Sequence, residues 1–126
     1  MKLVVALVLF AACSATEDRP ETLAFITETI LAPSCGTTEC HSSMVMRQGY
    51  AFDTVAAAQV SLAKNLIATC DIPPCDQAPS NSYLLTVITD KDSFGDRMPL
   101  DQALPNKDMV LIAKWITDGA EGYTPP

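Results

Sequence analysis

The chain has 126 residues with 8 basic and 15 acidic side chains, so its formal net charge at pH 7 is −7. This length suits one domain, and the acidic excess argues against a nucleic-acid partner, because phosphate backbones are bound through clustered Lys and Arg. With one histidine and no phosphate-binding loop, neither a nucleophile–base pair nor nucleotide chemistry is supported, so we expect neither a hydrolase nor a transferase.

The first twelve residues, MKLVVALVLFAA, have the pattern of an export signal. Lys2 provides a positive start, and Leu3 to Ala12 is an apolar run of ten residues, too short to span a bilayer. The small residues directly before Cys13 resemble a bacterial lipobox. The sequence therefore predicts a signal peptide at residues 1–12 and a lipidated tether at 13–19; cleavage nearby with a free Cys13 is the alternative. We expect the protein at the periplasmic face of a bacterial membrane, and we favour the outer membrane because Ser14, not Asp, follows Cys13.

Hydrophobic periodicity predicts two helices in the first half of the domain. The first covers residues 20–32, with Pro20 in its first turn and Pro33 at its end. The second follows Asp53, which we expect to cap it. Their predicted buried faces consist of Leu23, Ile26, Ile30 and Leu31 in the first helix and Val55, Ala58, Leu62 and Ala63 in the second.

Two more helices are predicted in the second half, separated by loops. The stretch 70–80 is rich in Pro, Asp and Ser and is predicted to be a loop. A short helix is expected from Asn81 or Ser82 to about residue 89. After a loop at 90–105, Asn106 is expected to cap the last helix and Gly119 to occupy its C′ position. The predicted inward residues of this last helix are Met109, Val110, Ala113 and Ile116 or Trp115.

No alternating strand pattern is present, so residues 20–126 are predicted to form a small all-α domain with long loops. Four short helices bury little apolar surface in a chain of this length. Such a domain is stabilised by a covalent cross-link or by a large buried cofactor.

The segment CGTTECHSS, residues 35–43, contains Cys35, Cys40 and the only histidine, His41. Zinc is disfavoured, because these three ligands crowd one loop, no second histidine exists, and thiols are oxidised outside the cytoplasm. A Cys35–Cys40 disulfide is geometrically possible and leaves His41 as a bystander. Covalent haem attachment explains all three residues.

Haem attachment requires two thiols for the two vinyl groups and an imidazole directly after the second thiol. Cys40 and His41 are adjacent, as in the usual C-x-x-C-H motif. Here the spacing is C-x4-C-H, so the loop has two extra residues, and Gly36 allows them to bulge outward.

A haem iron in an electron carrier usually has a second axial ligand, commonly methionine. Met44 and Met46 follow His41 too closely to reach the opposite face, and Met109 lies on a predicted core face. Met98 lies in a loop, and Pro99 favours an extended backbone at Met98. The sequence therefore predicts Met98 as the distal ligand.

The blocks APSCGTTECHSS, NSYLL, DRMP and LIAKWITDGA resemble, in order and spacing, a family of exported bacterial cytochrome c-like domains over residues 23 to 121. The resemblance implies a cytochrome c-like fold around one haem c. It also implies that Cys35 and Cys40 carry the haem, with His41 as proximal and Met98 as distal ligand. The segment MPLDQALP has less glycine than the family's strap often has.

Further residues complete the prediction. Cys70 and Cys75 repeat the haem spacing, but Asp76 stands where a histidine would be needed, so a Cys70–Cys75 disulfide is favoured over free thiols or a second haem. Trp115 is expected to pack in the core over a haem edge. Tyr83 and Arg97 are candidates to hydrogen-bond the haem propionates.

The predicted function is that of a mono-haem c-type cytochrome, an electron carrier and not an enzyme, which exchanges single electrons with redox partner proteins. His41 and Met98 together leave no open coordination site on the iron. Two alternatives stay open: a haem-free, disulfide-stapled lipoprotein that acts as a binding module, and a haem-based sensor in which Met98 is labile.

Overall fold

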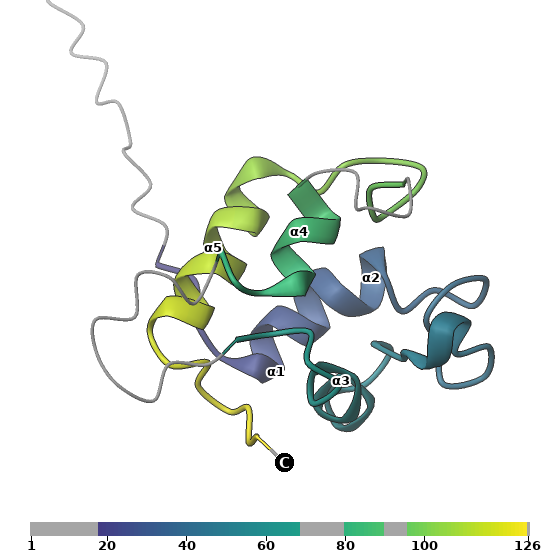
Figure 1. Ribbon diagram of the computed structural model, residues 1–126, viewed down its shortest axis with the longest axis horizontal. Helices are drawn as coiled ribbons and strands as arrows, with labels where there is room; N and C mark the ends of the chain where they lie inside the picture. Colours follow the sequence, from purple (N-terminus) through teal and green to yellow (C-terminus); the bar gives the residue numbers. More distant parts are fainter. Residues whose placement is uncertain (1–17, 69–79, 90–95, 126) are drawn as a thin grey trace, which may run out of the picture.

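The computed structural model describes residues 18–68, 80–89 and 96–125. All regular elements in these ranges are helical, without any strand, which confirms the all-α class (Figure 1). The predicted signal peptide, Cys13 and the Cys70–Cys75 pair lie outside the described residues. No helix in the described ranges is long and apolar enough to cross a membrane.

The first helix runs without a break through α1 (Leu23–Ile26), the π-helical segment η1 (Thr27–Leu31) and α2 (Ala32–Ser34). It begins later than predicted, because Thr22 has an extended backbone and its Oγ1 accepts a hydrogen bond from the Phe25 N–H at 3.3 Å. Pro33 does not end it. The Ala32 N–H donates to the Thr27 carbonyl five residues back, and this wide turn accommodates the proline ring that an ordinary turn would exclude.

The predicted buried face of this helix is confirmed. Leu23, Ile26, Ile30 and Leu31 are each at most 1% exposed. Thr27 is buried beside them, and its hydroxyl has no hydrogen-bond partner among the described residues. One face of the first helix is therefore part of the hydrophobic core.

A single turn of 3₁₀ helix, η2 (Arg47–Gly49), precedes α3 (Val55–Leu62). The cap of α3 is Thr54, whose Oγ1 accepts a hydrogen bond from the Ala57 N–H at 3.1 Å. The prediction that Asp53 caps this helix is wrong. Its carboxylate instead accepts two hydrogen bonds from Ser43, from the backbone N–H at 2.9 Å and from the hydroxyl at 2.7 Å.

The helix α4 (Tyr83–Thr89) follows Ser82, whose buried hydroxyl accepts a hydrogen bond from the Ala68 N–H at 2.9 Å. This contact ties the start of α4 to the end of the α3 region. The boundaries of α4 agree with the predicted third helix.

The last helix, α5 (Asn106–Thr117), starts at Asn106, which is its first helical residue and not its cap. The prediction that Val110 faces inward is also wrong, since Val110 is 61% exposed. At the other end, Gly119 has φ +99° at C′, and the N–H groups of Ala120 and Gly119 donate to the carbonyls of Trp115 and Ile116. This is a Schellman motif, so the predicted role of Gly119 is confirmed. The buried residues of α5 are Leu111, Ile112, Trp115 and Ile116.

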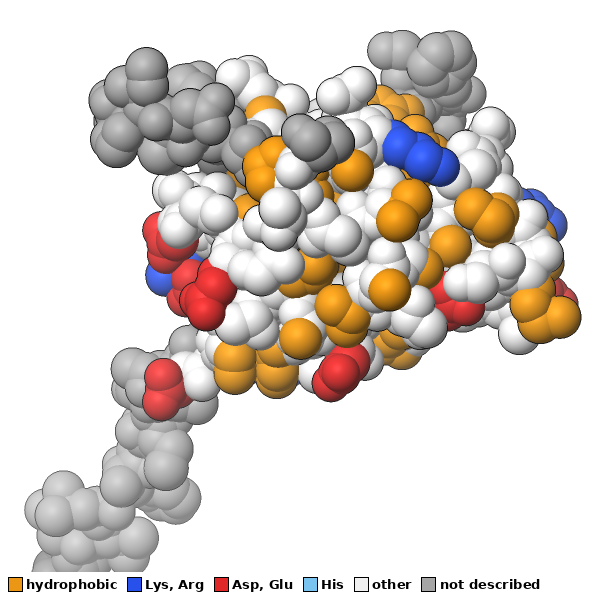
Figure 2. Space-filling model, turned by 90° about the horizontal axis from the view of Figure 1, so that it is seen from below, with side chains coloured by type: hydrophobic (Ala, Val, Ile, Leu, Met, Phe, Trp, Pro, Cys, Tyr) orange, Lys and Arg blue, Asp and Glu red, His pale blue; other side chains and the backbone are white. Residues whose placement is uncertain are grey.

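The helices α4 and α5 pack side by side, and α3 packs against α1 and η1 (Figure 1). The loop of residues 35–53 extends from the end of this bundle where α2 stops. Figure 2 shows hydrophobic side chains spread over one face of the molecule, with acidic side chains at several separate places and few basic ones. The helices enclose the hydrophobic core, and a cavity lies next to the loop of residues 35–53.

Candidate functional site

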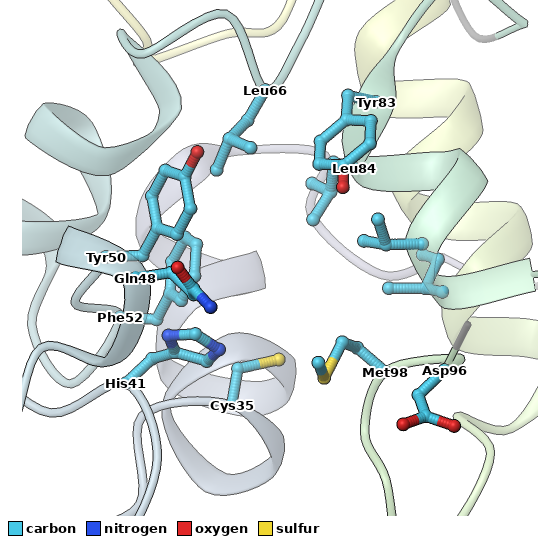
Figure 3. A pocket seen from close by; sticks show the side chains of 12 residues that line it. Cys35, His41, Gln48, Tyr50, Phe52, Leu66, Tyr83, Leu84, Asp96 and Met98 are labelled. Atoms are coloured by element: carbon cyan, nitrogen blue, oxygen red, sulfur yellow. The ribbon is translucent and has the colours of Figure 1, made fainter. Parts of the chain in front are cut away.

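A cavity of about 500 Å³ lies between the loop of residues 35–53 and α4 (Figure 3). This volume falls in the range of roughly 300–1,000 Å³ that small-molecule and cofactor sites occupy. Most of the lining side chains are apolar. The residues that line it are Cys35, His41, Gln48, Tyr50, Phe52, Leu66, Tyr83, Leu84, Val87, Ile88, Asp96 and Met98.

The His41 ring is oriented by a hydrogen bond to the backbone. Its Nδ1 lies 2.9 Å from the Arg47 carbonyl oxygen, which can only accept, so Nδ1 carries the proton. In the neutral ring this leaves the lone pair on the other nitrogen, Nε2, which is the atom that could bind a metal. The rings of Phe52 and Tyr50 approach the imidazole edge-on, with centroids 5.8 and 6.2 Å away. The imidazole is therefore held in a defined orientation.

Backbone hydrogen bonds hold the loop around His41. The His41 N–H donates to the Cys35 carbonyl at 3.0 Å, and the His41 carbonyl accepts from the Phe52 N–H at 2.7 Å. The Arg47 N–H donates to the Cys40 carbonyl at 3.2 Å. Because both backbone groups of His41 are paired, the position of its side chain follows from the loop itself.

Gly36 is required at its position for a different reason from the one predicted. It has no left-handed backbone; instead, a Cβ at this position would lie 2.7 Å from the Asp53 nitrogen and 2.8 Å from the Phe52 carbonyl carbon. Backbone atoms cannot move aside as the end of a flexible side chain can. The motif loop therefore passes so closely over residues 52–53 that only glycine fits.

The two motif cysteines differ in their surroundings. Both are free thiols and partly buried, but only Cys35 lines the cavity. Burial and the nearby Cys40 raise the pKa of the Cys35 thiol to about 12. A thiol with so high a pKa is a poor nucleophile at neutral pH, which argues against a catalytic cysteine. It fits a sulfur that remains uncharged in an apolar wall.

Met98 lies on the wall opposite His41 (Figure 3). Its N–H donates to the Val87 carbonyl in α4 at 2.7 Å, which fastens this segment to the helix. Met44 is 90% exposed, Met46 is also exposed, and Met109 packs against the core. Among the described methionines, Met98 alone lines the cavity.

The other predicted residues divide into two groups. Tyr83 lines the cavity. Arg97 does not, and its guanidinium donates to the Pro99 carbonyl at 3.2 Å. Trp115 is completely buried, as predicted, but its indole N–H donates to the Glu121 carbonyl at 3.0 Å and its side chain does not line the cavity.

Three lining residues of the His41 wall were not predicted: Gln48, Tyr50 and Phe52. Tyr50 and Phe52 have nearly parallel rings with centroids 6.5 Å apart, and both are aromatic residues two positions apart in an extended segment. The alternation of aromatic residues in the sequence Tyr-Ala-Phe could have indicated that Tyr50 and Phe52 share one face of an extended segment. A single glutamine in a loop carries no such signal.

Within the described parts of the chain, no three His, Cys, Asp or Glu side chains come together to hold a metal ion. An iron that arrives inside a porphyrin needs fewer protein ligands, since the ring supplies four nitrogens. One imidazole and one thioether on facing walls, with apolar side chains between them, suit such a group.

Comparison with family models, characterised proteins and solved structures finds no match for this chain.

Proposed function

We propose that the protein is a mono-haem c-type cytochrome that transfers single electrons outside the cytoplasm. The observation that supports this most strongly is the position of His41 and Met98 on facing walls of one largely apolar cavity, with Cys35 between them. The sequence motif C-x4-C-H and the cytochrome c-like resemblance are independent of that geometry. The cytochrome c-like fold is part of this proposal.

The chain's own residues would orient and shield the group. The Arg47 carbonyl accepts a hydrogen bond from His41 Nδ1, so Nε2 would be the nitrogen that holds the iron. The Met98 thioether on the opposite wall would be the second ligand, and as a thioether it would favour Fe(II) and raise the reduction potential. Leu84 and Ile88, which are almost completely buried, exclude water from the α4 side. When bound, haem supplies a one-electron Fe(II)/Fe(III) couple, and no other redox group is needed.

Covalent attachment would use Cys35 and Cys40. Cys35 already lines the cavity, whereas Cys40, directly before His41, does not. We therefore propose that the Cys40 side chain turns inward on attachment, while the backbone bonds of His41 stay in place.

An absorption spectrum and an intact mass test the proposal directly. Expressed with cytochrome c maturation factors, the protein should show a Soret band and the added mass of one haem. The double variant Cys35→Ser/Cys40→Ser should lose the covalent haem, and the matched pair Cys70→Ser/Cys75→Ser should keep it. A wild-type protein with neither Soret band nor haem mass would contradict the proposal and favour the disulfide-stapled module.

We also propose that a lipid on Cys13 anchors the protein at the periplasmic face of a bacterial membrane, most simply the outer membrane. Its partners would be redox proteins, and its acidic surface suits basic ones. Cys13→Ser should move the protein from the membrane fraction to the soluble periplasmic fraction. A wild type that is already soluble would refute the anchor without affecting the haem proposal.

A further inference from the structure

The loop that orients His41 also has an unusual backbone. Met46, Gln48 and Gly49 have φ angles of 48°, 54° and 79°, so two non-glycine residues adopt the left-handed conformation close together. Such conformations cost free energy and persist where the surroundings enforce them, often beside functional sites. Here the Gly49 N–H donates to the Met46 carbonyl at 2.7 Å, and the Lys64 ammonium donates to the Gly49 carbonyl at 2.5 Å.

This backbone directs the Gln48 side chain into the cavity, beside the His41 ring (Figure 3). A side-chain amide has two N–H donors. Within the described part of the chain, the Gln48 amide has no hydrogen-bond partner. Gln48 lines the cavity and is also exposed to solvent, so its two N–H donors can turn from water to an acceptor bound there.

The opposite wall has the opposite character. Asp96 lines it next to Met98, and its carboxylate repels anions. Arg97, the cation nearest in sequence, is outside the lining and occupied by the Pro99 carbonyl. A negatively charged ligand group in this cavity would therefore avoid the Asp96 side and find its donor on the His41 side.

We propose that Gln48 donates a hydrogen bond to a propionate carboxylate of the haem. The inference rests on the proposed function, because the propionates are the only anionic groups that haem brings into the cavity. The loop of residues 46–49 then has two tasks: its Arg47 carbonyl orients the axial histidine, and its Gln48 amide binds the acidic edge of the same group.

The electrostatic consequence has a definite sign. The negative charge of a propionate stabilises Fe(III) relative to Fe(II). A hydrogen-bond donor to the propionate weakens this effect and so raises the reduction potential. Gln48→Leu should lower the midpoint potential of the holoprotein, and Gln48→Lys should raise it. Both variants keep a long side chain on the same backbone, so local strain cannot explain shifts of opposite sign.

The experiment uses the haem-loaded protein in four forms: wild type, Gln48→Leu, Gln48→Lys and, as control, Gln102→Leu. Gln102 is exposed and does not line the cavity. Haem mass and the Soret band report whether the proposed function holds. Midpoint potentials at fixed pH and ionic strength, and the propionate bending band in resonance Raman spectra of the reduced protein, report the role of Gln48.

We expect the propionate band of Gln48→Leu to shift from the wild-type position, that of Gln48→Lys to indicate a retained donor, and Gln102→Leu to match wild type. Loaded Gln48→Leu with an unchanged propionate band and potential would overturn the inference while leaving the cytochrome proposal intact. Potentials that shift in the same direction in both Gln48 variants would overturn it as well.

Discussion

The two walls of the cavity are built differently. The His41 wall comes from one continuous segment, residues 35–53, in which backbone bonds join His41 to Cys35 and Phe52 and a further bond fixes the imidazole. The Met98 wall combines α4 with a separate segment that begins at Asp96. Among the described residues, one backbone hydrogen bond joins that segment to the helix, from the Met98 N–H to the Val87 carbonyl.

This difference separates two properties of the site. Positions on the His41 wall are set locally, so a change there disturbs the loop, the proposed proximal ligand and the two motif cysteines together. Positions on the Met98 wall depend on a contact between distant parts of the chain, so a change there alters the ligand and little else. The following predictions test this separation, beginning with the largest expected effect.

Replacement of His41 should have the largest effect. His41→Ala removes the ring whose Nδ1 is bonded to the Arg47 carbonyl, and with it the proposed axial ligand. We expect covalent haem to fall to the background level, measured by haem mass and Soret absorbance. His41→Ala with full haem content and unchanged axial spectra would show that the loop does not provide the proximal ligand.

Gly36→Ala should destabilise the same wall through the backbone. The added methyl would lie within 2.8 Å of backbone atoms of residues 52–53, and such overpacking typically costs about 1–3 kcal/mol. The urea concentration at the midpoint of unfolding and the haem content should both be lower than in the wild type. Gly119→Ala is the control: its Cβ meets nothing within 4 Å, so it should cost only the left-handed backbone strain of about 1–2 kcal/mol. If Gly36→Ala and Gly119→Ala incorporate haem equally, the close approach at Gly36 does not matter for the site.

Met98→Ala should leave the fold and the covalent haem in place. The oxidised wild type is expected to show a weak far-red band from thioether-to-iron charge transfer, which the variant loses. Its potential should fall, because a ligand that favours Fe(II) is replaced by water or hydroxide. Met44→Ala, at a position 90% exposed, is the control and should keep the band. Should Met44→Ala lose the band and Met98→Ala keep it, the distal ligand is misassigned; a wild type without any band would favour the sensor alternative.

Asp53→Ala should have the smallest effect, and the effect should depend on pH. Hydrogen bonds from the Ser43 N–H and hydroxyl hold the pKa of Asp53 below its usual value of 3.8. A carboxyl whose pKa is lowered by folding stabilises the protein above its unfolded pKa, and this contribution is lost as the pH falls through the folded value. At pH 7 the urea midpoint of unfolding should therefore be slightly higher for the wild type than for Asp53→Ala. The difference between the two midpoints should disappear at acidic pH. Glu39→Ala, at an exposed acidic residue of the same loop, is the control for the loss of one negative charge.

The sequence was sufficient to predict those features that depend on repeated, local signals. The apolar spacing of Leu23, Ile26, Ile30 and Leu31 identified the buried face of the first helix, and Gly119 identified the end of the last one. The prediction for Val110 was wrong because the inward face of α5 is set by which neighbours pack on it, and Leu111 and Ile112 occupy that face instead.

Other features depend on contacts between separate segments and leave no pattern. Asp53 was a reasonable helix cap, but its carboxylate is used by Ser43, ten residues earlier, and Thr54 has the required extended backbone. Glycine is needed at position 36 because the backbone of residues 52–53 lies against it. Sequence patterns around position 36 do not predict this contact. The inward direction of Gln48 follows from left-handed torsions that glutamine seldom adopts.

The N-terminal segment is clamped onto α5, since the Arg19 guanidinium contacts the Asp108 carboxylate at 2.6 Å and the Lys107 carbonyl at 2.7 Å. With the lipid that we propose on Cys13, only six peptide units separate the bilayer from this clamp, at most about 20 Å of extended chain. That is less than the width of a domain of this size, roughly 30 Å. The clamp and the His41 loop lie toward opposite ends of the long axis (Figure 1). A domain tethered this closely would stay next to the bilayer, so the partners that we propose for it would have to reach it within about one domain's width of the membrane surface.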